Sequence, residues 1–179
     1  MTCDVTAHHL ALTTAALVDY DPNVRVWPPL RSEEDQAALR SGLRSGLIDA
    51  VVSDHQPHHL EDKAHEFPVA ASGASALEMV APLLLERLAE DDLTASDLVR
   101  LLSQGPMESL GLEAQRLVEG QTADLTVLDP TRPWTVTPEA LASRGKNTPF
   151  QGHRFTGRAT LTIVAGEVVY TAPLGEEMS

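Results

Sequence analysis

The feature that most constrains the fold is a capped helix that leads at once into a short apolar strand. Ser32 and the acidic residues 33–35 are typical of a helix N-terminus, where side-chain oxygens and negative charge stabilise free backbone N–H groups. Gly46 is typical of a helix end, and the mostly apolar run Leu47–Val52 follows directly. A short apolar run after a helix indicates a parallel strand buried on both faces. We therefore expect a helix up to Ser45, then a strand, and an α/β fold.

Composition and charge restrict the class of protein. Hydrophobic residues make up 42% of the 179 residues, within the range of ordinary globular chains. The formal net charge of −13 and an isoelectric point near 4.8 argue against nucleic acid or an anionic membrane as partner. The single cysteine, Cys3, excludes a disulfide framework, and no apolar run approaches the ~20 residues of a membrane span. We therefore expect a cytoplasmic chain with neither nucleic acid nor membrane as partner.

Apolar periodicity predicts further elements on either side of this unit. A short strand is expected near Cys3, before the helix. Helical spacing of leucines and alanines predicts a helix over residues 74–89. A second helix is expected to begin at Thr94, which forms a capping box with Asp97, and to end at Gly105-Pro106.

From about residue 117 the pattern changes from helical spacing to alternation. This alternation predicts a small antiparallel sheet that is interrupted by a turn at Asp129-Pro130. Its clearest element is a hairpin that turns at Ala165-Gly166. The change of pattern predicts two domains, residues 1–116 and residues 117–179.

Polar residues at the ends of the two predicted strands are the candidates for chemistry. Asp54, His55 and His58 follow the strand at 47–52, and His8-His9 follow the strand near Cys3. The carboxyl ends of parallel strands carry the active site in α/β barrels, where carboxylates and imidazoles can bind metal or move protons. A loop-stabilising Asp54 beside exposed histidines is the structural alternative. Because the chain has no His-x-His and no His-Glu-x-x-His motif, the residues alone indicate one half of a site.

Distinctive sequence blocks lie along nearly the whole chain: Val5–Leu10, Pro28–Asp35, Ile48–His58, Gly120–Val127, Lys146–Phe150 and Gly166–Tyr170. In this order they resemble the C-terminal half of a dihydroorotase of the amidohydrolase superfamily. The resemblance implies an α/β fold: the C-terminal part of a (β/α)₈ barrel of the TIM type, followed by a small antiparallel β domain. In the whole protein this domain would be a composite, urease-like β-sandwich.

The resemblance also implies an activity and roles for particular residues. The family catalyses the reversible cyclisation of N-carbamoyl-L-aspartate to dihydroorotate, a step of de novo pyrimidine biosynthesis, at one or two zinc ions. Asp54 matches the aspartate that binds metal and carries the proton, and His58 and Gly73 match substrate contacts. His8-His9 match a Pro-His-His block that is not a metal-ligand pair. The family's other metal ligands would precede residue 1, so we expect that this chain alone does not hold zinc stably.

Two residues depart from the pattern and leave two interpretations open. Trp27 stands where catalytic members have a substrate-binding asparagine, and Ser72 stands where they usually have phenylalanine. One interpretation is a dihydroorotase whose C-terminal part, inactive alone, is this chain. The other is a non-catalytic scaffold that assembles with aspartate carbamoyltransferase. Barrel strands left open at their edges predict that this chain alone forms an oligomer or is partly unfolded.

Overall fold

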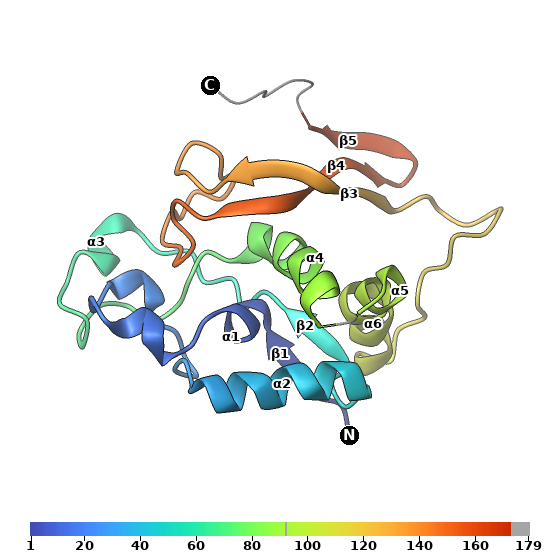
Figure 1. Ribbon diagram of the computed structural model, residues 1–179. Coiled ribbons are helices and arrows are strands. Elements are labelled where there is room, and N and C mark those ends of the chain that lie inside the picture. The colour runs from blue at the N-terminus through green and yellow to red at the C-terminus, as the bar shows by residue number, and fades with distance from the viewer. Residues whose placement is uncertain (92, 173–179) are drawn as a thin grey trace.

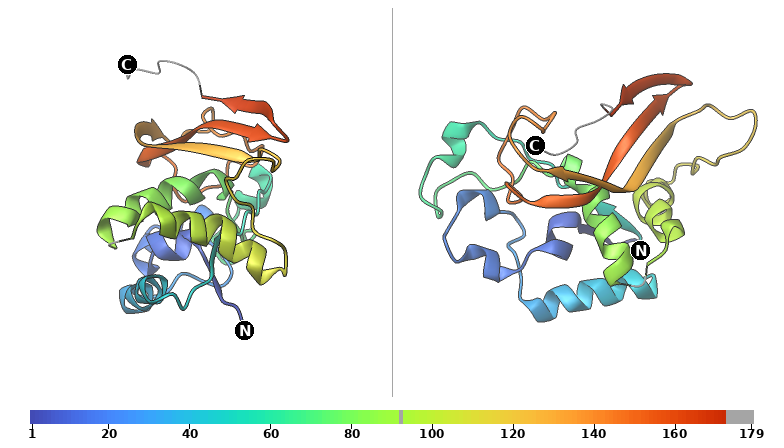
Figure 2. Two further views of the ribbon diagram at one scale, coloured as in Figure 1. Left: turned by 90° about the vertical axis from the view of Figure 1, so that its right-hand side faces the viewer. Right: turned by 45° about the horizontal axis from the view of Figure 1, so that its top comes forward.

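The computed structural model describes residues 1–91 and 93–172, which form two layers (Figure 1). One layer holds a parallel strand pair, β1 (Asp4–Thr6) and β2 (Ala50–Val52), with helices around it. The other is a three-stranded antiparallel sheet, which lies on the side of helix α4 away from β1 and β2 (Figure 2). None of the helices in the described ranges is long and apolar enough to cross a membrane.

The strand pair confirms the parallel arrangement expected from the apolar run. Asp4 pairs with Ala50, Val5 with Val51 and Thr6 with Val52, so both strands end at the same edge. Helix α2 (Glu33–Ser45) begins at a capping box between Ser32 and Asp35 and ends at Gly46, whose φ of 74° is left-handed. The residues that follow β1 and β2 therefore meet at one edge of the pair.

Shorter helices surround the strand pair. They are α1 (Ala7–Ala11), α3 (Leu60–Lys63) and three 3₁₀ turns, η1 (Thr14–Leu17), η2 (Pro22–Val24) and η3 (Leu77–Met79). The helix expected from residue 74 begins later, because Ala74 instead forms a parallel bridge with His55 and the backbone turns helical only at η3. Helix α4 (Val80–Glu90) follows, and its Val80, Leu83 and Leu84 side chains are buried in the core.

The expected helix end at Gly105-Pro106 is wrong. Helix α5 (Ala95–Val99) begins at the predicted Thr94 capping box, passes through a π-helical turn, η4 (Arg100–Gln104), and continues as α6 (Gly105–Ser109). Pro106 has no N–H to donate, and the wider π-helical turn that precedes it lets the helix continue without that hydrogen bond. Gly105 is required for packing, since a Cβ there would lie 1.8 Å from the carbonyl oxygen of Asp49.

The antiparallel sheet has the order β3-β4-β5, and its hairpin is the predicted one. Strand β4 (Arg154–Val164) joins β5 (Glu167–Thr171) through Ala165 and Gly166, both at positive φ, as a tight hairpin turn requires. The turn expected at Asp129-Pro130 is wrong. These residues lie inside β3 (Leu125–Thr135), where the pairing register with β4 shifts, so a bulge replaces the turn.

The main apolar core joins the two layers, and a smaller cluster around Val24, Val26 and Leu30 lies apart from it. Buried side chains of the main core come from helices, the strand pair and the antiparallel sheet alike, among them Leu10, Leu43, Val51, Met79, Leu84, Leu101, Trp134 and Phe155. The Trp134 indole donates a hydrogen bond to the carbonyl of Gly157 at 3.0 Å. The predicted boundary at residue 116 falls in the irregular segment between α6 and β3, and the division into two domains stays a prediction.

Candidate functional site

Asp54 directly follows β2 and is held in an unusual backbone conformation. Its φ of 45° is left-handed, which is uncommon for a residue other than glycine and clusters at functional sites. Its Oδ1 accepts a hydrogen bond of 2.7 Å from the side-chain amide of Gln56. Its Oδ2 is buried and has no hydrogen-bond partner in the described part of the chain. One carboxylate oxygen is thus fixed, and the other is left free to bind a ligand.

His8 lies in the first turn of α1, directly after β1, and is fully buried. Neither ring nitrogen finds a hydrogen-bond partner among residues 1–91 and 93–172. Burial and, to a smaller extent, the neighbouring His9 together lower the pKa of His8 to about 4, although the Asp54 carboxylate acts in the opposite direction. The imidazole is therefore neutral at physiological pH, and it lies within electrostatic reach of Asp54.

Both ring nitrogens of His9, by contrast, form hydrogen bonds that fix the loop after β1. Its Nε2 donates to the carbonyl of Pro28 at 3.1 Å, and its Nδ1 accepts from the hydroxyl of Thr6 at 2.6 Å. His55 also has a structural role, because its Nδ1 accepts from the backbone N–H groups of Ala76 and Leu77. The two neighbouring histidines at positions 8 and 9 thus have different roles, and His55 faces η3 rather than the free oxygen of Asp54.

The unpartnered atoms of His8 and Asp54 fit a metal ion. Neutral imidazole nitrogens and carboxylate oxygens are zinc ligands, and leaving such groups buried without a partner costs free energy. No group of three or more His, Cys, Asp or Glu side chains that could hold a metal occurs in the described ranges. The two residues can therefore supply part of a coordination shell, but not the three protein ligands that catalytic zinc usually has.

The other two predicted site residues lie in the loops that flank Asp54. The His58 Nε2 donates to the carbonyl of Ser72 at 2.8 Å, which fixes the ring against the second loop. Gly73 has a φ of 123°, and a Cβ there would lie 2.5 Å from Oε1 of Gln56. Gly73 therefore leaves the space in which the Gln56 side chain reaches Asp54. Sequence reasoning missed Gln56 as a positioning residue.

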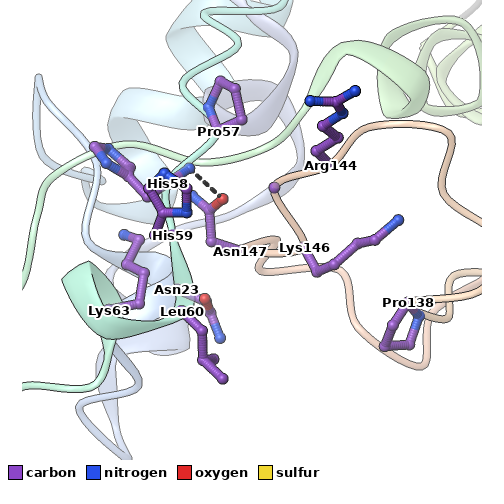
Figure 3. Close-up of a pocket in the computed structure, with 11 residues that line it drawn as sticks. Asn23, Pro57, His58, His59, Leu60, Lys63, Pro138, Arg144, Lys146 and Asn147 are labelled. Carbon is purple, nitrogen blue, oxygen red and sulfur yellow. Dashed lines mark hydrogen bonds between the residues drawn. The ribbon is translucent and has the colours of Figure 1, made fainter.

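Asn147, also missed, ties these two loops together from a distant part of the chain (Figure 3). Its Oδ1 accepts from the His58 N–H at 2.8 Å, and its Nδ2 donates to the carbonyls of Gln56 and Gly73 at 3.1 and 3.3 Å. Its own carbonyl accepts from the Ser75 N–H at 2.7 Å. Because the side chain is buried, this one asparagine sets the relative position of the loops that carry His58 and Gly73.

Replacing Asn147 with alanine is expected to lower the free energy of unfolding by about 2 kcal/mol. The change leaves one buried N–H and two carbonyls without their partner, and each such group costs about 1–3 kcal/mol when it stays dry. Urea denaturation monitored by circular dichroism measures the effect. Asn23→Ala is the matched control, since the other asparagine is only partly buried, and we expect it to change stability by less than about 0.5 kcal/mol. Equal losses in both variants would contradict the role of Asn147.

Trp27 and Ser72, the two departures from the family pattern, lie together at a separate apolar hollow. Its volume is about 260 Å³, and Leu30 and Phe67 also line it. The indole of Trp27 is 74% exposed, so it is not part of the core. The structure therefore places an aromatic surface on the loop after η2, near the His58 partner Ser72.

Comparison with known proteins gives consistent matches over nearly the whole chain. The model of the "Amidohydrolase family" matches residues 5–169. Proteins named dihydroorotase from Pelobacter propionicus and Geotalea daltonii are 46% and 44% identical over 170 residues, 95% of this chain. The chain spans about 40% of the length of these relatives.

Solved structures show the same architecture. An L-hydantoinase (dihydropyrimidinase) from Arthrobacter aurescens superimposes with a TM-score of 0.87 at 32% identity, over 95% of this chain and 39% of that one. A D-hydantoinase (dihydropyrimidinase) from Thermus sp. reaches a TM-score of 0.84 over 98% of this chain and 41% of that one. At 24% identity, the second likeness concerns the fold alone.

Proposed function

The chain belongs to the amidohydrolase family, and from this premise we propose that it forms the C-terminal part of a dihydroorotase. The reaction would be the reversible cyclisation of N-carbamoyl-L-aspartate to dihydroorotate, in pyrimidine biosynthesis. The observation that carries the proposal is the pair of buried, unpartnered groups, His8 and Asp54, at the carboxyl ends of adjacent parallel strands. Relatives named dihydroorotase that share 41–46% identity support the choice of reaction.

We assign His8 and Asp54 as two ligands of the catalytic zinc. This assignment revises the expectation that the His8-His9 block contributes no metal ligand, because only His9 is occupied by hydrogen bonds. Bound zinc would polarise the amide carbonyl and favour hydroxide over water. Two protein ligands hold zinc weakly, so we propose that stable binding needs ligands from the part of the relatives' length that this chain does not span.

Residues of this chain would also transfer the proton and position the substrate. The Asp54 carboxylate, oriented by the Gln56 amide, would also accept the proton of the attacking water and return it to the ring nitrogen. The His58 imidazole and the backbone of Gly73 would contact the substrate. Asn147 would hold both of them in place, which makes it a positioning residue rather than a catalytic one.

A second function is favoured by Trp27. An exposed indole cannot supply the paired donor and acceptor of an amide, and it offers apolar surface to another protein. The second proposal is a non-catalytic dihydroorotase-like subunit that assembles with aspartate carbamoyltransferase. Both proposals include a cytoplasmic oligomer. For this chain alone the reason is that β1 and β2 pair only with each other in the described ranges and leave their outer edges open.

An assay of dihydroorotate ring opening by the complete, zinc-supplied protein separates the two functions. We expect turnover in the ordinary enzymatic range of about 1–10³ s⁻¹. The substrate would be unlabelled dihydroorotate, with N-carbamoyl-L-aspartate measured as product. A protein that binds aspartate carbamoyltransferase but produces no N-carbamoyl-L-aspartate would overturn the enzymatic proposal and leave the scaffold.

A further inference from the structure

A basic cleft lies between the segment at 57–63 and the segment at 138–147 (Figure 3). Its volume is about 670 Å³, within the usual range of small-molecule sites. Neither His8 nor Asp54 lines it, and His58 is the one proposed substrate contact that it shares. The cleft therefore adjoins the proposed substrate contacts but does not include the proposed metal ligands.

The charge of this cleft is opposite to that of the chain. The whole sequence has 26 Asp and Glu residues against 20 Lys, Arg and His residues. Eleven residues line the cleft, and no Asp or Glu is among them. Five of the eleven are basic: His58, His59, Lys63, Arg144 and Lys146. A concave region with one sign of charge concentrates counter-ions, here anions, against the field of the rest of the protein.

Lys63 is the buried member of this group. Only 5% of it is exposed, and its ammonium donates to the carbonyls of Pro22 and Ala71 at 2.9 and 2.8 Å. An ammonium has three N–H donors, so one remains for a ligand. Burial and the charge of Arg25 together lower the pKa of Lys63 to about 8, although the Asp21 carboxylate acts in the opposite direction. No carboxylate forms a salt bridge with Lys63 in the described ranges, so a bound anion would stabilise its charge.

The opposite wall carries Arg144 and Lys146 on either side of a glycine that fixes the width of the cleft. A Cβ at Gly145 would lie 2.5 Å from Cβ of Pro57, so only glycine lets the two walls approach this closely. The Lys146 ammonium donates to the Leu141 carbonyl at 2.7 Å and keeps further donors. The Arg144 guanidinium is exposed and forms no salt bridge within residues 1–91 and 93–172.

We infer that this cleft binds a small molecule that carries phosphate groups. Guanidinium groups recognise phosphate through two parallel hydrogen bonds, and lysines add point charges. Pro57, Leu60 and Pro138 supply apolar surface beside these donors, which suits an organic phosphate. The inference goes beyond the proposed function, since the cleft needs neither zinc nor the ring-opening reaction.

Isothermal titration of pyrophosphate into the complete protein, at constant ionic strength, tests this inference. We expect saturable binding that weakens at least tenfold in the Arg144→Ala/Lys146→Ala double variant. Arg116→Ala is the control, because Arg116 is exposed and lies outside the cleft. This variant should bind pyrophosphate with the affinity of the wild type. Circular dichroism of each variant shows that a loss of binding does not come from unfolding.

Three results would overturn the inference: no heat of binding for pyrophosphate, equal affinity in the double variant, or an equal loss in Arg116→Ala. Tighter binding of a short glutamate peptide than of pyrophosphate would also overturn it, because the cleft would then take an acidic protein segment. None of these results depends on turnover, so failure here is distinguishable from failure of the proposed function.

Discussion

Replacing Asp54 with asparagine is expected to lower the rate of dihydroorotate ring opening by a factor of about 10²–10⁴, the usual contribution of general acid–base catalysis. Asparagine keeps the shape of the side chain and an oxygen for the Gln56 amide, but it has no carboxylate oxygen to accept a proton. We therefore expect kcat to fall while the fold is retained. Steady-state kinetics of the complete zinc-supplied protein measure the effect, and zinc content is determined in parallel.

Asp129→Asn is the matched control for this prediction. The Asp129 carboxylate also accepts short hydrogen bonds, from the N–H and hydroxyl of Thr131, but it lies partly buried on β3 and away from the candidate site. Its replacement should leave kcat unchanged. An Asp54→Asn protein that retains wild-type turnover would refute the assignment of Asp54 as proton carrier.

His8 is expected to make the metal-free protein sensitive to acid. The pKa of His8 is lowered from 6.5 to about 4 in the folded chain, chiefly by burial, so the unfolded chain binds the proton more readily. The free energy of unfolding should be unaffected by His8 above pH 6.5 and should fall as the pH drops towards 4. The total loss from this one group is about 3 kcal/mol. Urea denaturation of chelator-treated protein at several pH values measures it.

His8→Leu should remove this part of the pH dependence, because leucine cannot take up a proton. His65→Leu is the control, since His65 is exposed, and its profile between pH 7 and pH 4 should follow that of the wild type. A His8→Leu protein with an unchanged slope would mean that His8 is solvated or charged in the folded state.

Helices, strands and turns that have a clear local sequence signal could be predicted from the sequence. The Ser32 cap, the Gly46 stop and the apolar run after it predicted α2 and β2, because capping and burial of a short parallel strand depend on residues near in sequence. The hairpin turn at Ala165-Gly166 was predicted for the same reason. The two parallel strands in the described part of the chain lie where they were expected, near Cys3 and Ile48, and the barrel to which they would belong stays a prediction.

The wrong predictions concern elements whose partners are distant in sequence. Gly105 looked like a helix stop, but it serves close packing against the backbone of Asp49 while the helix continues. Asp129-Pro130 has the composition of a turn, yet pairing with β4 keeps it within a strand as a bulge. In both cases tertiary contacts outweigh local preference.

In the candidate site, too, features with a local sequence signal could be predicted, whereas contacts between distant residues could not. The position of Asp54 at the end of a strand could be predicted, and the expected roles of Asp54, His58 and Gly73 remain proposals that their positions support. His8 could not be separated from His9 without the structure, because only the partners of each ring distinguish them. Asn147 acts on residues about 90 positions away, and no local pattern signals such a contact.

Anomalous X-ray diffraction at the zinc absorption edge, on crystals of the complete protein, tests most directly whether His8 and Asp54 form half of the metal site. We predict an anomalous peak about 2.0–2.2 Å from a ring nitrogen of His8 and from a carboxylate oxygen of Asp54. A zinc-containing, active protein whose anomalous peak lies away from both residues would contradict the account.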